Sequence, residues 1–332
     1  MFSRLITTVL LGLLLALFSR PAAAQELLAI HHIDVDQGDA TLVVAPNGRT
    51  LLIDAGLTGR GDTVARFLRQ RGIDTVDAVL ATHYDRDHYG GLPRVAEAGI
   101  TIEAWYDRGG KAFLPESKTD DDGDEYDRYV AAAESPKQLL PGDSIRLDSA
   151  VSIVAVASNG HVRGAVGKYD IDSLEENGYS VAALINYRGF NYFAGGDLTR
   201  PVEERIVREA AVGDVDVYHV NHHGSATSSS HAFLQAIRPE VAVISSGSHG
   251  LFHHPRQAVL DTLQLVKGIE VYQTNRLQDE DLGGVGGNVS EEFIADLDAD
   301  GADGTISVVV GRDSFTVHLP ARGIRRSYPI ER

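Results

Sequence analysis

Hydrophobic and polar positions in the first third of the chain follow the spacing of strands, then of a helix, then of a strand again. Three short apolar runs separated by glycine-containing turns predict a β-meander at 27–34, 40–45 and 50–53. Asp62 caps an amphipathic stretch with helical spacing that ends at Gly72. The apolar run at 76–81 then predicts a buried strand.

The second half of the chain repeats this order of strands and helices. Strands are predicted at 181–186, 192–194, 215–220 and 241–245. Helices are predicted from Pro201 and from Arg256. Two tandem halves of this kind imply an α/β (α+β) fold in which two sheets pack face to face with helices outside.

The two ends of the chain differ from its middle. Residues 1–24 combine Arg4, an apolar run and small residues before Gln25, which is the pattern of a cleaved secretory signal. The apolar run is short for a membrane span, so we expect an exported protein, periplasmic or secreted, with no stable membrane anchor after cleavage. A main domain is expected at 25–277, followed by a small C-terminal β appendage at 278–332.

Four potential metal ligands lie within six positions directly after the strand at 76–81. They are His83, Asp85, Asp87 and His88. On a straight strand the odd-numbered residues would face one side and His88 the other, whereas a turn lets all four converge. Loops at strand ends often carry function, and a metal site is the first hypothesis for this loop.

Further polar residues follow the ends of other predicted strands. Asp54 follows 50–53, Asp197 follows two glycines after 192–194, and the pair His222 and His223 follows 215–220. Adjacent histidines at a strand end are more typical of ligands or stacked rings than of a core. For Asp54 and Asp197 the alternative is a turn aspartate that only shapes the backbone.

Three motifs occur in order along the chain. They are the segment IDVDQGDA at 33–40, the His-x-Asp-x-Asp-His-x-Gly-Gly run that starts at His83, and the tetrapeptide HHGS that starts at His222. Together they resemble the hydrolase domain of the ComEC competence proteins and their free-standing relatives in the metallo-β-lactamase superfamily. The resemblance covers about residues 27–275 and implies a metallo-β-lactamase αββα sandwich for the domain at 25–277.

The resemblance also implies two divalent metal ions, Zn2+ or Mn2+. Asp85 stands where most of the superfamily has a second histidine, Asp197 resembles the bridging carboxylate, and His222 best matches the last ligand, with His223 as the fallback. The implied metal ligands are His83, Asp85, Asp87, His88, Asp197 and His222. One site lacks a histidine because Asn177 stands in its register, so that site is expected to be weak or empty.

The same resemblance implies roles for the residues around the metal ions. Asp54 is expected to support the ligand loop from behind. Asp87 and His254 are the expected catalytic residues, with His254 as an acid toward the leaving oxygen or as a substrate ligand. Substrate contacts are expected from Ser225, His223 and Asn177.

Hydrolysis by a metal-bound hydroxide is the predicted reaction. Three hypotheses remain for the bond that is hydrolysed. The favoured one is a phosphoester or phosphodiester, and the second is a lactone, lactam or other acyl bond. In the third, the chain is a non-catalytic metal-binding module and hydrolyses no bond. The sequence contains no cysteine, which excludes thiolate ligands and disulfides.

The charge balance bears on the substrate. The chain has 47 Asp and Glu against 30 Lys and Arg, a formal net charge of −17. Binding of long nucleic acid depends on a basic surface, so this balance disfavours it, although bound metal cations offset part of the local charge. A small phosphoester or similar small molecule is the expected partner.

Two acidic segments have open interpretations. The segment 107–140 is either a solvated surface or a lid in which Tyr106, Tyr126 and Tyr129 contact substrate. The loop at 296–304 imitates the first half of a calcium loop but has Ser307 where glutamate is needed. An acidic β-turn is favoured there, and bound Ca2+ is the alternative.

Overall fold

The computed structural model describes residues 27–112, 120–167, 175–249, 252–281, 283–298 and 304–330. The predicted signal peptide at 1–24 lies outside these residues, as does most of the loop at 296–304 that was considered for Ca2+. Within the described part of the chain, no helix has the length and apolar character needed to cross a membrane.

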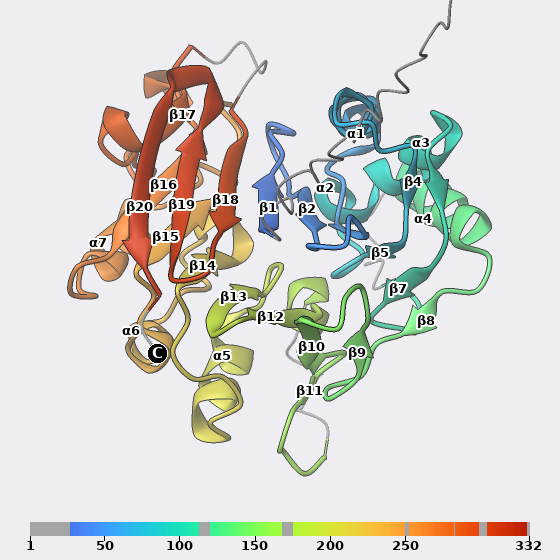
Figure 1. Cartoon of the computed structure of the whole chain (residues 1–332), viewed down its shortest axis with the longest axis horizontal. Coiled ribbons are helices and arrows are strands. Elements are labelled where there is room, and N and C mark those ends of the chain that lie inside the picture. Colours follow the sequence, from blue (N-terminus) through green and yellow to red (C-terminus); the bar gives the residue numbers. More distant parts are fainter. Residues whose placement is uncertain are drawn as a thin grey trace, which may run out of the picture.

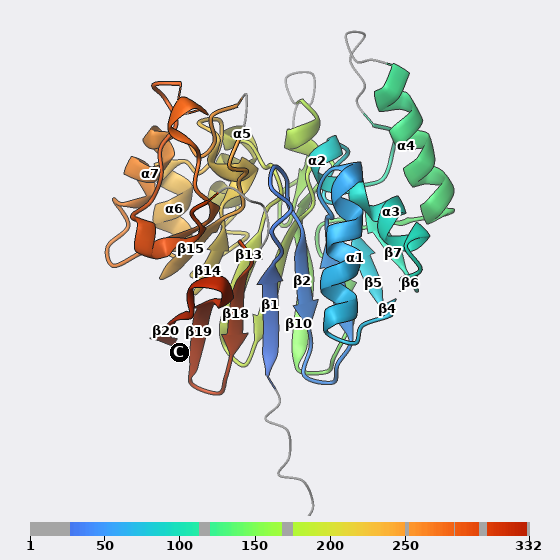
Figure 2. The same ribbon diagram turned by 90° about the horizontal axis from the view of Figure 1, so that it is seen from above.

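Two β-sheets form the centre of the molecule and lie face to face (Figures 1 and 2). The first contains, in spatial order, β20 (Ile324–Pro329), β19 (Ser314–Leu319), β18 (Ile306–Val310), β1 (Leu28–His32), β2 (Thr41–Val44), β3 (Thr50–Ile53), β5 (Ala78–Leu80), β7 (Trp105–Asp107) and β8 (Lys137–Gln138). The second contains β11 (His161–Val162), β10 (Val151–Ser158), β12 (Ala182–Tyr187), β13 (Phe190–Ala194), β14 (Val217–His219), β15 (Val241–Ile244), β16 (Glu270–Asn275) and β17 (Ile294–Asp296), with β9 (Ser144–Ile145) beside β10. A separate short pair consists of β4 (Thr75–Val76) and β6 (Thr101–Ile102).

Helices cover the outer face of each sheet (Figure 2). The first sheet carries α1 (Gly61–Gln70) and α3 (Gly91–Glu97), and the second carries α5 (Arg200–Arg208), α6 (His231–Ile237) and α7 (Gln257–Leu263). The amphipathic pattern explains this layering, since Val64 and Leu68 of α1 are fully buried against the first sheet. A central core takes side chains from both sheets, among them Leu28, Tyr192 and Val243. The layers confirm the predicted αββα sandwich.

The C-terminal strands are not an appendage, which corrects the prediction from sequence. β18 pairs with β1 along its whole length in the antiparallel direction, and β17 pairs with β16. Val308 and Phe315 are fully buried in the core between the sheets. A strand with one apolar face needs a surface to cover it, and pairing with β1 extends the first sheet so that these strands bury that face in the main core.

The segment 107–140 contains a helix, α4 (Asp120–Ala133), that the sequence did not predict. Tyr129 on α4 is buried and donates a hydrogen bond to Asp107. The ring of Tyr126 packs edge-on against Tyr84 in the loop after β5, with the ring centroids 5.2 Å apart. The helix therefore braces the candidate metal-binding loop through aromatic contacts.

Candidate metal centre

The loop after β5 and the short helix α2 (Arg86–Tyr89) position His83 and His88. Both side chains are fully buried. Behind them, the Asp54 carboxylate accepts hydrogen bonds from the backbone N–H and the hydroxyl of Thr82 and lies 2.9 Å from Nδ1 of His88. The Nδ1–H of His88 therefore points at Asp54, and its Nε2 faces the site.

His222 and His223 occupy consecutive left-handed backbone conformations, with φ of 54° and 52°. Such conformations are uncommon for residues with a side chain and persist only where neighbouring contacts enforce them. The backbone N–H of His222 donates to the carbonyl of Gly196, and the buried carboxylate of Glu203 accepts from the side chain of Asn221. The turn directs the two imidazoles into two different groups of side chains.

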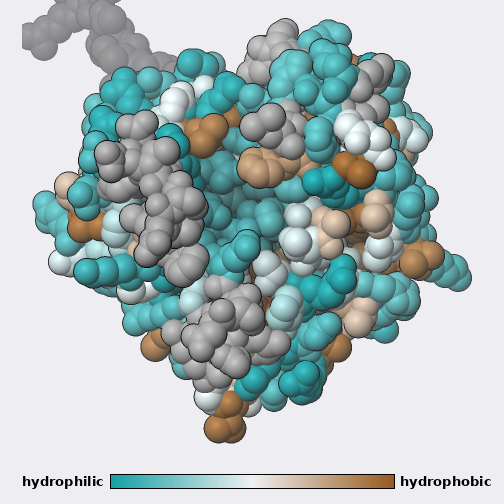
Figure 3. Space-filling view, turned by 180° about the vertical axis from the view of Figure 1, so that it is seen from behind, coloured by the Kyte–Doolittle hydropathy of each residue, from teal (hydrophilic) through white to brown (hydrophobic). Residues whose placement is uncertain are grey.

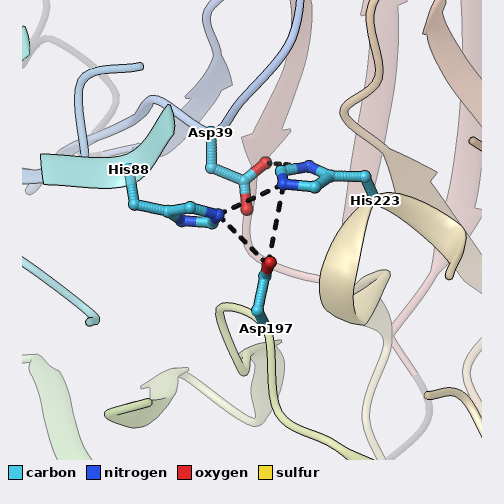
Figure 4. Close-up of side chains that lie close together, drawn as sticks. All are labelled: Asp39, His88, Asp197 and His223. Atoms are coloured by element: carbon cyan, nitrogen blue, oxygen red, sulfur yellow. Dashed lines mark hydrogen bonds and ion pairs between the residues drawn. The ribbon is translucent and has the colours of Figure 1, made fainter. Parts of the chain in front are cut away.

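The first group surrounds His88 and His223 (Figure 4). Nε2 of His88 lies 3.2 Å from Nε2 of His223 and 3.1 Å from Oδ1 of Asp197. Nε2 of His223 is 3.4 Å from Oδ2 of Asp87, and its Nδ1 is 3.6 Å from Oδ1 of Asp39. Asp39, His88, Asp197 and His223 offer ligand atoms that all lie within 4.8 Å of one another. No role was predicted for Asp39 from the sequence.

The second group lies on the other side of the Asp197 carboxylate. Oδ2 of Asp197 is 3.9 Å from Nε2 of His83 and 3.5 Å from Nε2 of His222. Nε2 of His83 is in turn 3.6 Å from Oδ2 of Asp85. The side-chain amide of Asn177 lies 3.4 Å from Nε2 of His222. Asp197 thus turns one oxygen toward each group, which is the arrangement of a carboxylate shared by two ions.

The structure assigns the two neighbouring histidines to different groups. His223, which was expected to contact substrate and was the fallback for the last metal ligand, lies in the group of His88. His222, the favoured match for that ligand, lies in the group of His83. The physical reason is the left-handed turn, which strand periodicity does not reveal. His222 brings to the second group an imidazole that the sequence did not predict there.

Several buried nitrogen and oxygen atoms in these groups, all of which could bind a metal ion, have no hydrogen-bond partner among the described residues. They are Nε2 of His83 and one carboxylate oxygen each of Asp39 and Asp197. Leaving a buried polar atom without a partner costs about 1–3 kcal/mol, so a cluster of such atoms indicates a ligand that the chain itself does not supply. Imidazole nitrogens and carboxylate oxygens suit zinc, iron and manganese. The residues therefore fit bound divalent metal ions.

The two groups form the floor of an open cavity of about 610 Å3, which Figure 3 shows as a hydrophilic hollow in the middle of one face. Its walls include Gln37, Leu57, Arg86, Asn177, Phe252 and His254. Tyr106, Tyr126 and Tyr129 are not among the described residues that line the cavity.

Ser225, which was predicted to contact substrate, does not line this cavity either. Its hydroxyl lies 3.0 Å from the hydroxyl of Thr227, which lies 3.1 Å from Nδ1 of His222. Ser225 is buried, and these two contacts connect its hydroxyl to the His222 ring. Its position therefore favours a role in orienting His222.

The sequence model of the Metallo-beta-lactamase superfamily matches residues 33–249. The chain belongs to this superfamily. The match includes the ligand loop, Asp197 and the His222–His223 turn, and the buried donor set fits the metal dependence of the family. The chain accordingly has the fold of this superfamily together with a buried set of side chains that fits divalent metal ions.

Curated relatives confirm the resemblance to competence proteins. The chain is 28% identical to ComE operon protein 3 of Bacillus subtilis over 251 residues, which cover 70% of the chain and 30% of that protein. It is also 28% identical to Recombination protein 2 of Haemophilus influenzae over 240 residues, which cover 71% of the chain and 26% of that protein. The chain thus spans less than a third of the length of these relatives. Among solved structures, CmlA, a diiron β-hydroxylase of Streptomyces venezuelae, is 11% identical, with a TM-score of 0.42 and coverage of 73% of this chain and 47% of that one.

In the metal-free site, buried carboxylates raise the pKa values of two histidines whose Nε2 atoms lie 3.2 Å apart. Burial opposes the charge on His88, but Asp197 and Asp54 outweigh burial and hold its pKa well above the usual value. Burial likewise opposes the charge on His223, and Asp197 and Asp39 raise its pKa in the same way. Burial alone would raise the pKa of Asp197, yet the surrounding imidazoles hold it well below its ordinary range. A metal ion must therefore displace the proton that lies between these two nitrogens.

Metal binding near neutral pH is expected to release about one proton from the pair His88 and His223. Both pKa values are raised in the folded protein, so the stability that these charges give the metal-free fold is present below about pH 6.5 and is lost as pH rises through the folded pKa values. Metal affinity should accordingly increase with pH. Calorimetric titration in buffers of different ionisation enthalpy measures the protons released, and the His223→Ala variant should release fewer.

Replacing His223 or His222 by alanine should separate the two groups. His223→Ala removes a ligand from the buried group of His88 and should weaken one metal site on the order of a hundredfold or more, while His222→Ala should weaken the other site. Metal content after dialysis against graded chelator checks both. His249→Ala, at an exposed histidine paired with Asp281, serves as the control and should keep full stoichiometry. Loss of the same site in both variants would contradict the assignment.

Proposed function

We propose that this protein is an exported, metal-dependent phosphodiesterase that acts on small phosphodiesters. The observation that carries the proposal is the Asp197 carboxylate, which turns one oxygen to each of two donor groups on the floor of an open cavity. Divalent ions held by these side chains would supply the positive charge that a displacement at phosphorus requires. Export follows from the signal pattern at 1–24.

Bound divalent ions would supply an activated water and positive charge to stabilise the phosphoryl oxygens. The chain itself fixes where the ions sit. Asp54 orients the imidazole of His88, and the backbone carbonyl of Ser245 accepts the Nδ1–H of His223 at 3.0 Å. Gln37 donates a hydrogen bond to Oδ2 of Asp87, which fixes that carboxylate beside His223 and favours a ligand role for Asp87.

His254 is placed to bind the substrate as a neutral imidazole. Burial, and then the neighbouring His223 and His222, lower its pKa to about 3. Its Nδ1 is buried without a hydrogen-bond partner among the described residues, so a proton there would be unsatisfied and the neutral form should carry its proton on Nε2. His254 lines the cavity, where this N–H can donate to a phosphoryl oxygen. A neutral donor replaces the leaving-group acid that the sequence suggested.

Small phosphodiesters fit the proposal better than long nucleic acid. The net charge of −17 opposes the approach of a polyanion, and counterion release needs several basic side chains along the binding surface. Arg86 is the only lysine or arginine among the described residues that line the cavity. A single phosphate at the metal ions is therefore the expected anionic contact.

The experiment that tests the proposed function is a parallel assay of the full chain loaded with Mn2+ or Zn2+. The substrates are bis-p-nitrophenyl phosphate, a lactone and a cephalosporin. Phosphodiester hydrolysis that a chelator abolishes and added metal restores is the expected result. Hydrolysis of the lactone or the cephalosporin alone would replace the proposal by acyl hydrolysis. Metal binding without turnover of any of the three would favour the non-catalytic module.

A further inference from the structure

Two large apolar side chains are exposed on the walls of the catalytic cavity. Phe252 is 60% exposed and Leu57 is 36% exposed, and both line the cavity whose floor holds the metal-binding groups. The ring of Phe252 stacks on His254 at a centroid distance of 5.9 Å and an interplanar angle of 26°. At 60% exposure, the ring also has surface that the described residues leave uncovered. Apolar surface at the rim of a polar cavity is typical of a ligand subsite.

The cationic side chain of the cavity is already neutralised. Arg86 donates from Nη2 to Oε1 of Glu125 at 3.1 Å, and its Nε forms an ion pair with the second oxygen of the same carboxylate. The hydroxyl of Thr58 also donates to Oε1 of Glu125. The carboxylate of Glu125, which lies on α4, thus pairs with the Arg86 guanidinium at two points and balances its charge. A second phosphate on the substrate would therefore have to compete with Glu125 for Arg86.

We propose that the substrate is a phosphodiester with a single negative charge whose non-leaving ester group is flat and apolar and stacks on Phe252. The inference rests on the proposed function and adds the chemical class of the substrate. The phosphate lies over the metal-binding groups beside His254. The apolar group covers the exposed face of Phe252, with Leu57 as a further apolar wall of the same cavity.

Two substrates with the same leaving group isolate this contact. They are phenyl p-nitrophenyl phosphate and methyl p-nitrophenyl phosphate, which release the same nitrophenolate and differ only in the group expected at Phe252. Stacking of one aromatic ring is worth about a tenfold change in binding. The metal-loaded full chain should prefer the phenyl ester by about tenfold or more in kcat/KM.

The Phe252→Ala variant should lose this preference. We expect kcat/KM for the phenyl ester to fall about tenfold while the value for the methyl ester changes little. Leu265→Ala is the matched control, because Leu265 is also an exposed apolar residue, at 62%, but does not line the cavity. It should keep the wild-type preference.

Each other outcome overturns the inference. An equal fall on both esters would mean that Phe252 acts only by supporting His254. An unchanged preference in Phe252→Ala, or a wild-type protein that does not prefer the phenyl ester, would mean that no flat group is bound there. These results leave the proposed function intact if both esters are hydrolysed. Failure of the wild-type protein to hydrolyse either ester would overturn the proposed function together with the inference.

Discussion

Replacing Asp197 by alanine is expected to remove both metal ions and to lower kcat/KM for phosphodiesters on the order of a thousandfold or more. The reason is geometric. Its Oδ1 lies 3.1 Å from Nε2 of His88, and its Oδ2 faces Nε2 of His83 and of His222. No other side chain in the described part of the chain joins the two groups in this way, so one substitution should empty both sites. Metal content and turnover should be measured on the same sample.

Two controls separate loss of metal from loss of fold. Asp261→Ala removes an exposed carboxylate on α7, where Asp261 accepts a hydrogen bond from Gln257, and should leave metal content and activity unchanged. Asp197→Asn keeps the size of the side chain but removes its charge, and should also lose metal while unfolding cooperatively. Full metal content in Asp197→Ala would contradict the shared-carboxylate arrangement.

The sandwich and the ligand loop could be predicted because the information for them is local in the sequence. Apolar residues such as Val64 and Leu68 recur at helical spacing and fix the face that α1 buries. The run from His83 to His88 follows a buried strand directly. A dense set of donor side chains at a strand end has few purely structural explanations, so it identified the site before any tertiary contact was known.

The choice between His222 and His223 could not be made from the sequence. Both are imidazoles at the same strand end, and their directions are set by two consecutive left-handed residues. That conformation depends on the carbonyl of Gly196 and on the anchor of Asn221 at Glu203. Both contacts come from elements distant in the sequence, so no local pattern encodes them.

Long-range pairing also explains two other differences between the sequence prediction and the structure, which concern the C-terminal strands and Asp39. β1 has β2 on one side and β18 on the other, and the sequence showed only the hairpin partner. The alternating strands beyond residue 300 therefore looked like a separate unit. Asp39 lay within a motif that supported the family resemblance, yet its contacts with His223 and with His219 of β14 join two sheets. Such contacts become visible only when the sandwich is assembled.

Replacing His254 by alanine is expected to lower kcat/KM about a hundredfold while leaving metal content unchanged. His254 lines the cavity but is not part of the cluster of ligand atoms. Burial and two neighbouring imidazoles lower its pKa to about 3, so it donates a hydrogen bond as a neutral ring. A neutral donor stabilises the phosphoryl oxygen whatever group leaves. The loss should therefore be the same for an alkyl and for a nitrophenyl phosphodiester.

A general acid would behave differently in two measurements. It would lose more on the alkyl ester, because an alkoxide needs a proton to leave and nitrophenolate does not. It would also give the wild-type protein an inflection in kcat/KM against pH that disappears in the variant, whereas a group with a pKa of about 3 contributes none between about pH 5 and 9. The variant His254→Asn adds a third criterion. It keeps a side-chain N–H without an ionisable ring, so a hydrogen-bonding role predicts partial recovery of activity, and an acid role predicts none.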